Sequence, residues 1–391
     1  MNESAAAPAS AAATPADPAA ARPAAQPAAA SPAAAQPAPK RRIAYWDNAR
    51  FLLIVLVVIG HVISTVRTDS SLGFALYSFI YLFHMPAMIL LSGLFSKPEA
   101  SPKAVASTVQ LLATWLLWEG VWAVIRAAVE GRAPGSGFLV NPSWTLWFLV
   151  TLATMRILLP YIARLRHPLL FSIALALASG LLPAVGTAFS ASRTMVFMPF
   201  FVAGWLIRER GWLDGQWFTR PARAARIGAW ALLGAVGIVF AVAVHLQDFW
   251  RIDRWLTWRD DYLTAFERGP IGDWQPTEWV SVSLGGIAVT ALLLAMAAAL
   301  TLAVLIVAPR RQSIITVWGA RTLYVYLLHG PVVWVLRETG VIDAVAAWGV
   351  AGVLLLTAIA IAIALLLSMT WITRVFRVII EPRVDWMLRR G

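Results

Sequence analysis

Long apolar stretches separated by short polar segments dominate the chain from residue 43 to residue 373. A helix that crosses a bilayer needs about 20 mostly apolar residues, and in lipid a helix satisfies all of its own backbone polar groups. The pattern predicts an all-α polytopic membrane protein with about ten transmembrane helices. We place the spans near residues 46–66, 74–96, 105–128, 144–162, 168–188, 193–208, 225–246, 280–308, 314–336 and 346–371.

The segments on either side of this apolar region have a different composition. Residues 1–42 consist mostly of Ala and Pro, with few side chains large enough to pack, which predicts a disordered tail. Residues 374–391 carry several arginines and predict a basic tail. We therefore expect an Ala/Pro-rich tail, a ten-helix membrane domain over residues 43–373, and a basic C-terminal tail.

The bulk composition excludes a soluble enzyme. Of the 391 residues, 60% are hydrophobic and only 13% are charged, whereas a soluble domain carries about 25% charged residues. The chain has no cysteine, which excludes a thiolate nucleophile and a Cys-ligated metal site. The net charge of +12 would suggest nucleic acid in a soluble protein, but here the basic residues cluster between apolar runs. We expect the lipid bilayer, and no nucleic acid, as a partner.

These basic clusters predict the topology, because Lys and Arg accumulate in cytoplasmic loops. With ten spans and the N-terminus inside, 20 of the 32 Lys and Arg residues fall in inside segments, 7 in outside segments and 5 within spans. The skew predicts a multi-pass protein of the cell membrane with both termini in the cytoplasm.

Ionisable side chains within spans are costly and therefore indicate function. Arg50 and His61 lie eleven residues apart in the first span, so in a helix they differ by about 20° in azimuth and about 16 Å along the axis. His61 is the candidate catalytic base, since imidazole titrates near neutral pH. Arg50 and Asp47 are candidate catalytic or binding residues at the cytoplasmic end. Alternatively, Asp47 caps the helix, Arg50 snorkels to the headgroups, and His61 is a hydrogen-bonded core residue.

His84 and His329, on the second and ninth spans, are expected at a depth similar to that of His61. Both are candidate catalytic residues that orient His61 or stabilise an oxyanion. Pro86 follows His84 closely, and the structural alternative is a kink whose freed carbonyl bonds the histidine. No pair of these histidines has the i,i+3 or i,i+4 spacing of a compact ligand set, so we expect no metal.

Charged side chains of the third, fourth and sixth spans are candidates for substrate binding. Glu119 and Arg126 lie seven residues apart on one helix face, Arg156 lies within the fourth span, and Arg193 opens the sixth. We expect Glu119 to neutralise one of these arginines inside the bundle.

Tryptophans are concentrated in the segments predicted to lie at the outer face. Trp144 and Trp147 are candidate binding residues, although an aromatic belt at the membrane interface also explains them. The long outside segment 248–279 mixes Trp255 and Trp258 with carboxylates. Aromatic faces and carboxylates often hold sugars, so we hypothesise that this segment contacts a substrate. The alternative is an interfacial belt with a solvated loop.

Several of these residues resemble motifs of the membrane-bound acyltransferase 3 family, most closely the branch similar to fucose 4-O-acetyltransferases. The resemblance covers about residues 42–372. Its two most specific motifs lie on the first two spans, in order and correctly spaced. The motifs are Tyr45 to Arg50 with Val58 to His61, Phe83 to Pro86 with Leu91 to Gly93, Trp144 to Leu149, Phe197 to Phe201 with Gly204, and Tyr326 to His329.

This resemblance implies an O-acyltransferase that moves an acyl group, usually acetyl, from cytoplasmic acyl-CoA to a hydroxyl of an extracytoplasmic carbohydrate or cell-envelope acceptor. It also implies that Arg50 and His61 are essential. Many relatives carry an arginine-rich motif after the second helix, where this chain offers Lys97 and Lys103, which lack arginine's bidentate fork. Arg50, Lys97 and Lys103 are the candidate acyl-CoA contacts. The roughly 16 Å from Arg50 to His61 is comparable to a pantetheine arm.

Two other function classes fit part of the pattern. A secondary transporter or flippase of a polar or anionic substrate would also place Arg, Glu and His inside spans, but it would need no acyl-CoA. A non-catalytic membrane scaffold would allow Arg50 and His61 to be replaced freely.

Overall fold

The computed structural model describes residues 44–387 except 132, 134, 136 and 244. Its regular structure is helical, apart from isolated bridges that Trp250 and Trp274 make with Ile271. This confirms the all-α prediction. The Ala/Pro-rich tail lies outside the described residues, as do the last four residues of the basic tail.

Within the described ranges, each of the ten expected spans overlaps a helix, although the helix in the fifth span (168–188) already ends at Ala178 and the ninth span is divided in two. The long helices are α1 (Ala44–Ile63), α2 (Ser71–Leu94), α3 (Pro102–Glu130), α4 (Trp147–Ile162), α5 (Pro168–Ala178), α6 (Ala191–Glu209), α8 (Arg223–Val242), α12 (Trp279–Val307), α14 (Thr322–Glu338) and α16 (Val350–Leu367). The connections contain α7 (Gln216–Thr219), α9 (Leu246–Phe249), α10 (Ile252–Trp255), α11 (Tyr262–Arg268), α13 (Ile314–Gly319), α15 (Val341–Ala346) and α17 (Thr370–Ile380). Short 3₁₀ helices are η1 (Ser179–Leu181), η2 (Ala188–Ser190), η3 (Trp212–Asp214) and η4 (Asp385–Met387).

By helix length and composition, the protein is a multi-pass membrane protein. In the part of the chain that the structure describes, seven helices are long and apolar enough to span a bilayer: α1, α2, α3, α8, α12, α16, and the helix over 188–209 formed by η2 and α6. Two shorter apolar helices cover 147–162 and 168–181. The count of ten spans and the orientation of the termini stay predictions.

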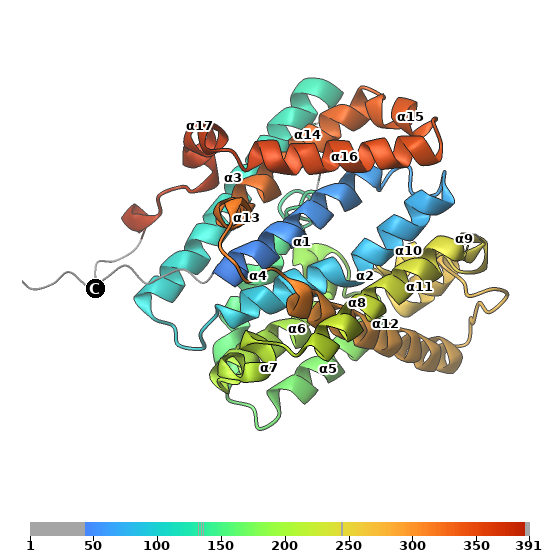
Figure 1. Ribbon diagram of the computed structural model, residues 1–391, viewed down its shortest axis with the longest axis horizontal. Helices are drawn as coiled ribbons and strands as arrows, with labels where there is room; N and C mark the ends of the chain where they lie inside the picture. The colour runs from blue at the N-terminus through green and yellow to red at the C-terminus, as the bar shows by residue number, and fades with distance from the viewer. Residues whose placement is uncertain (1–43, 132, 134, 136, 244, 388–391) are drawn as a thin grey trace, which may run out of the picture. The chain divides into compact units, whose positions relative to one another are not determined.

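Helices α1 and α2 lie at the centre of the bundle. In their most apolar stretches 72% of the residues are buried within the protein, compared with 17% in α8. α1 packs against α2 on one side and against α13, α14 and α16 on the other (Figure 1). α2 in turn packs against α6, α8 and α12. Most side chains on α1 therefore face other parts of the protein.

Two glycines permit a very close approach of α2 and α6. A Cβ atom added at Gly93 would lie 2.0 Å from the carbonyl oxygen of Phe201, and one at Gly204 would lie 2.1 Å from that of Leu90. Small residues let membrane helices pack backbone to backbone, where van der Waals contact is the main source of association. The glycines of two sequence motifs thus fix the separation of two helices that position the site.

Buried polar contacts join α1 to the start of the ninth expected span. The Asn48 side chain donates to the carbonyls of Pro309 and Arg311, both at 2.9 Å, and accepts from Thr316 Oγ1 at 2.7 Å. A Cβ added at Gly319 would meet the Asp47 carbonyl oxygen at 1.8 Å. The expected span over 314–336 is accordingly divided into α13, which packs on α1, and α14.

Candidate functional site

A cavity of about 240 Å³, here called the histidine cavity, lies among α1, α2, α6, α14, the start of α4 and the 254–259 segment. Its lining includes His61, His84, Tyr81, Trp144, Arg193 and Trp258. Five of these six positions were predicted from the sequence as candidate functional residues, and they come from separate expected segments. The fold therefore brings these five predicted residues, together with Trp147, to one cavity, whereas the other predicted residues lie outside its lining.

One face of α1 forms a wall of the cavity. Ile54, Val57, His61 and Ser64, which are three or four residues apart, all line it. Arg50 lies four residues before Ile54 and shares this face, as the helical spacing predicts. It is not among the lining residues, so the structure places Arg50 at the apolar end of the wall and His61 inside the cavity.

The Arg50 side chain has partners at that end of the helix. Its Nη1 lies 3.3 Å from Asp47 Oδ1, and its guanidinium lies 4.4 Å from the centre of the Phe95 ring. Phe95 follows α2 directly, the exposed Lys97 lies in the connection between α2 and α3, and the exposed Lys103 lies in the first turn of α3. Arg50 therefore contacts the start of the segment that carries Lys97.

His84 is fixed by its own helix. Its Nδ1 donates to the carbonyl of Ile80 at 2.7 Å, and the residue is buried. The carbonyl that Pro86 deprives of a donor belongs to Leu82, four residues earlier. The structural alternative expected His84 to bond the carbonyl that Pro86 frees. This is wrong, because His84 bonds the carbonyl of Ile80 instead of that of Leu82. Because a carbonyl only accepts, Nδ1 of His84 carries the proton and Nε2 is the acceptor.

The half-buried His61 lies beside the fully buried His329. Their ring centres are 5.2 Å apart. His329 Nδ1 donates to the carbonyl of Val325 at 2.9 Å, which leaves Nε2 as an acceptor. Among the described residues, His329 Nε2 and His61 Nδ1 are both buried without a hydrogen-bond partner. The three histidines belong to no group of three or more potential metal ligands within those residues.

Aromatic rings surround these histidines. His61 makes an edge contact with Trp144, with ring centres 5.2 Å apart, and Tyr81 does so with His84 at 4.9 Å. Tyr77 stacks on Tyr81 at 3.8 Å and also lines the cavity. Neither tyrosine was predicted from the sequence as a site residue, although their spacing from His84 along α2 (seven and three residues) places all three on one face.

The Glu119 carboxylate accepts its hydrogen bonds from a tryptophan and a serine rather than from an arginine. It accepts from Trp115 Nε1 at 3.0 Å, and from the backbone N and Oγ of Ser143 at 2.7 and 2.5 Å. Arg126 also donates to Ser143 Oγ. The expected direct neutralisation is thus replaced by a network through Ser143, which holds the backbone next to Trp144. This gives Glu119 and Arg126 a positioning role in the fold, outside the cavity lining.

Arg156 and Arg193 have different surroundings. Arg156 Nη1 donates to Ser107 Oγ on α3 at 3.0 Å and lies outside the cavity lining. Arg193 lines the cavity, lies 4.7 Å from the centre of the Trp147 ring, and donates through Nε to the carbonyl of Thr257 at 3.0 Å. The structure brings only Arg193 of the two to the candidate site.

The two tryptophans of the 254–259 segment also differ. Trp258 lines the cavity, whereas Trp255 is buried beside it and donates through Nε1 to the carbonyl of Gly269 at 2.7 Å. Trp258 and Trp144 have positive φ values of 54° and 34°. Bulky residues rarely adopt such a backbone, and where they do the surrounding structure must impose it. The unusual backbone thus occurs at two tryptophans of the cavity wall.

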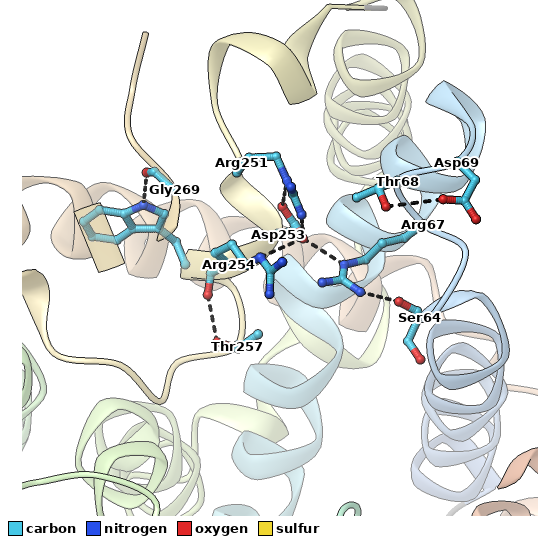
Figure 2. Close-up of polar contacts among 10 residues, drawn as sticks. Ser64, Arg67, Thr68, Asp69, Arg251, Asp253, Arg254, Thr257 and Gly269 are labelled. Atoms are coloured by element: carbon cyan, nitrogen blue, oxygen red, sulfur yellow. Dashed lines mark hydrogen bonds and ion pairs between the residues drawn. The ribbon is translucent and has the colours of Figure 1, made fainter. Parts of the chain in front are cut away.

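Figure 2 shows a charged cluster, here called the Asp253 cluster (Asp253, Arg67, Arg251 and Arg254). Arg67 and Arg254 of this cluster line the histidine cavity. Asp253 is fully buried and lies 2.8 Å from Nε of both Arg67 and Arg251, and 3.9 Å from Nε of Arg254. Burial raises the pKa of the Asp253 carboxyl, but hydrogen bonds from Arg251 and Arg67 outweigh this and hold the pKa below its usual value. From the sequence, these arginines were expected only as charges of the outside segments.

A comparison with protein families gives one match. The model of a family described as an acyltransferase domain, Acyl_transf_3, matches residues 43–369, which is most of the chain and includes every lining residue of the histidine cavity. No curated protein and no solved structure matches the chain.

Proposed function

The chain belongs to the acyltransferase 3 family, and on this premise we propose that it is an O-acyltransferase that uses cytoplasmic acyl-CoA, with acetyl as the expected group. The acceptor would be a hydroxyl of an extracytoplasmic carbohydrate or cell-envelope glycan. Membership of the family carries the general activity, that of a membrane acyltransferase. The donor, the acceptor and the similarity to the fucose 4-O-acetyltransferase branch belong to the proposal.

The observation that supports this proposal is the position of His61 in the wall of a cavity inside the family domain. Because Nδ1 of His61 is buried, Nε2 is the ring nitrogen available to a substrate. The acceptor O–H would give its proton to Nε2 as its oxygen attacks the thioester carbonyl carbon. When the C–S bond breaks, the departing thiolate would take the proton back from His61. General base catalysis of this kind contributes about 10²- to 10⁴-fold to a rate.

His329 and His84 would assist this step in different ways. The imidazolium that forms at His61 carries N–H donors on both nitrogens, and Nε2 of His329 is a buried acceptor on the adjacent ring. We assign His329 the role of stabilising the protonated His61. His84 lines the cavity and is held by Ile80, so its position supports a role in orienting a substrate.

The acyl donor would enter from the end of α1 that carries Arg50. Arg50, Lys97 and Lys103 supply positive charge there for CoA phosphates, and the roughly 16 Å of helix rise to His61 matches the reach of a pantetheine arm. Ile54 and Val57, which lie between Arg50 and His61, give the acyl group an apolar wall. The family match favours this reading over a transporter, which would need no acyl-CoA.

The test is acyl transfer from labelled acetyl-CoA to cell-envelope glycans in membranes that contain the wild type, His61→Ala or a control. His245→Ala is a suitable control, because that side chain is 90% exposed outside the cavity. We expect the His61 variant to lose about 10²- to 10⁴-fold in rate at matched expression, and the control to retain full activity. Equal transfer by all three proteins would remove His61 from the mechanism. If the wild type transferred no acyl group from any acyl-CoA to any acceptor, the transporter reading would replace the proposal.

A further inference from the structure

The arginine-rich end of the histidine cavity is one-sided in charge. Arg67, Arg193, Arg254 and Arg259 all line it, and within the described residues no Asp or Glu side chain does so. Low-dielectric walls of one sign focus the electric field and concentrate ions of the opposite sign. The cavity is therefore built to attract an anion.

The nearby carboxylates do not balance these arginines. Asp253 is shared by Arg67, Arg251 and Arg254, as Figure 2 shows. A single arginine would be enough to neutralise the one negative charge of Asp253. The two further arginines leave an excess of positive charge at the cavity wall.

The same imbalance recurs on the neighbouring segment. Asp260 lies 3.7 Å from Arg259 and 3.0 Å from Arg268. Arg193 contacts a backbone carbonyl and an aromatic ring rather than a carboxylate in the described structure. Five arginines thus share two carboxylates near one end of a small cavity, and Arg193 adds a sixth positive charge there. An uncompensated charge in such a place is unfavourable, and a bound anion would offset it.

The position of the arginines assigns the anion to the acceptor. Ile54, Met85 and Met88 line the cavity at the level that precedes His61 along α1, whereas Ser64 and Arg67 follow it. The proposed donor enters from the apolar side. A CoA phosphate near Arg50 therefore lies on the opposite side of the cavity from the arginines, with the reacting thioester between the two.

We infer that the acceptor carries an anionic group, a carboxylate or a phosphate, which Arg193 and Arg254 bind while a neighbouring hydroxyl lies at His61. This inference rests on the proposed function. A guanidinium binds either group with two parallel hydrogen bonds. The cavity of about 240 Å³ is smaller than the roughly 300–1,000 Å³ of sites that enclose a drug-sized ligand. It therefore takes one charged sugar unit of a glycan, with the remainder of the glycan outside.

The first test needs only the wild-type protein and two pairs of acceptors that differ in charge. Detergent-purified full-length protein is supplied with labelled acetyl-CoA and either 4-nitrophenyl glucuronide or 4-nitrophenyl glucoside, and either glucose 6-phosphate or glucose. We expect the anionic member of at least one pair to have a KM at least tenfold lower than its neutral partner. Equal KM values within both pairs, or preference for the neutral acceptors, would overturn the inference and leave the proposed function intact.

A binding measurement separates this inference from the proposed function. Sodium glucuronate or inorganic phosphate is added to the wild type at constant ionic strength, with chloride as the reference, and thermal unfolding is followed. Stabilisation of the wild type that Arg193→Gln lacks supports an anion site even if no acyl transfer occurs. Failure of both anions to stabilise the wild type would overturn the inference.

Variants then identify which substrate the arginines bind. Arg193→Gln should raise the KM of the anionic acceptor about tenfold to hundredfold, the effect of one charge-assisted contact, and leave the KM of acetyl-CoA unchanged. Arg193→Lys should recover part of the loss. Arg268→Gln is the matched control, because it removes one positive charge from the same region at a half-exposed side chain outside the lining. A rise in the KM of acetyl-CoA instead of the acceptor would overturn the inference and assign the arginines to the donor phosphates. If Arg193→Gln does not fold, Arg254→Gln gives the same comparison.

Discussion

The Asp253 cluster makes a stability prediction that can be worked out from the structure. Replacing Asp253 by Asn keeps the size of the side chain and removes its charge. Arg67 and Arg251 then lose the carboxylate that each contacts at 2.8 Å, and Arg254 loses a partner at 3.9 Å. Arg67 lies four residues beyond the end of α1, Arg251 directly precedes α10, and Arg254 belongs to α10. The substitution thus loosens the connection between the end of α1 and the 254–259 segment.

The cost can be estimated from burial. Removing one partner of a buried ion pair destabilises a protein by about 3–5 kcal/mol. Asp253 is fully buried, but the side chains of Arg67, Arg251 and Arg254 retain 17%, 30% and 38% exposure. These arginines remain partly hydrated when the carboxylate is lost, so we expect a cost at the lower end of this range, about 3 kcal/mol. Since the segment also forms a cavity wall, activity should fall with stability.

The pH dependence of this cost follows from the pKa of Asp253. The folded-state pKa is lowered by the hydrogen bonds from Arg251 and Arg67, so the contribution is fully present above the unfolded-state pKa of about 3.9. It is lost as the pH falls through the lower folded-state value. The stability difference between the wild type and Asp253→Asn should therefore be constant from about pH 5 to pH 8 and shrink only below about pH 4.

The assay is thermal unfolding of detergent-purified protein, followed by tryptophan fluorescence at several pH values. Asp248→Asn is the matched control, because that carboxylate is 69% exposed and lies in the same connection. We expect the control to melt with the wild type and Asp253→Asn to melt lower. Equal melting of all three proteins at pH 7, or a wild-type advantage that already disappears between pH 5 and pH 7, would refute the reasoning.

Two further predictions concern the cavity wall and the helix contact behind it. Trp258→Ala should raise the KM of the acceptor several-fold, because Trp258 lines the cavity. Trp255→Ala should lower the melting temperature and leave the KM unchanged, because Trp255 lies outside the lining and bonds Gly269. The reverse pattern in acyl-transfer kinetics would contradict the assignment. Gly204→Ala should destabilise the protein by more than about 1–3 kcal/mol, since its Cβ would lie 2.1 Å from the Leu90 carbonyl oxygen. Gly234→Ala should unfold at or above the wild-type temperature, because a Cβ at that position meets nothing within 4 Å. Equal melting of both variants would show that α2 and α6 can separate freely.

The sequence predicted the helices well because lipid leaves the backbone few alternatives. The expected span over 280–308 is α12 (Trp279–Val307), and the expected first two spans match α1 and α2 within a few residues. The observed helices differ from the predicted spans where contacts between distant parts of the chain determine the helix ends. The ninth expected span is divided because Gly319 packs directly on the backbone of α1, and a hydropathy pattern contains no information about that contact.

The candidate site was predictable only in part, for a similar reason. The shared face of Arg50 and His61 follows from helical spacing, and the structure confirms that spacing as far as His61 and Ser64. Trp255 and Trp258 are equivalent in the sequence, and only the fold shows that one lines the cavity. Arg67 was counted as a loop charge, since nothing local indicates that Asp253, 186 residues further along the chain, is its partner.

The order of side chains along α1 suggests how one site could serve substrates from two sides of a membrane. Arg50 lies at one end, Ile54 and Val57 form an apolar stretch, His61 follows, and Arg67 lies just beyond the helix. Under the proposed function, the thioester passes the apolar stretch while the charged parts of donor and acceptor stay at opposite ends. No charged group then has to cross the hydrocarbon region, which would be the most costly step. The same geometry limits the acyl group, because a longer chain must pass Ile54 and Met88 within a cavity of only about 240 Å³. The enzyme should therefore prefer acetyl over longer acyl groups, for a reason that lies in the apolar stretch rather than in His61.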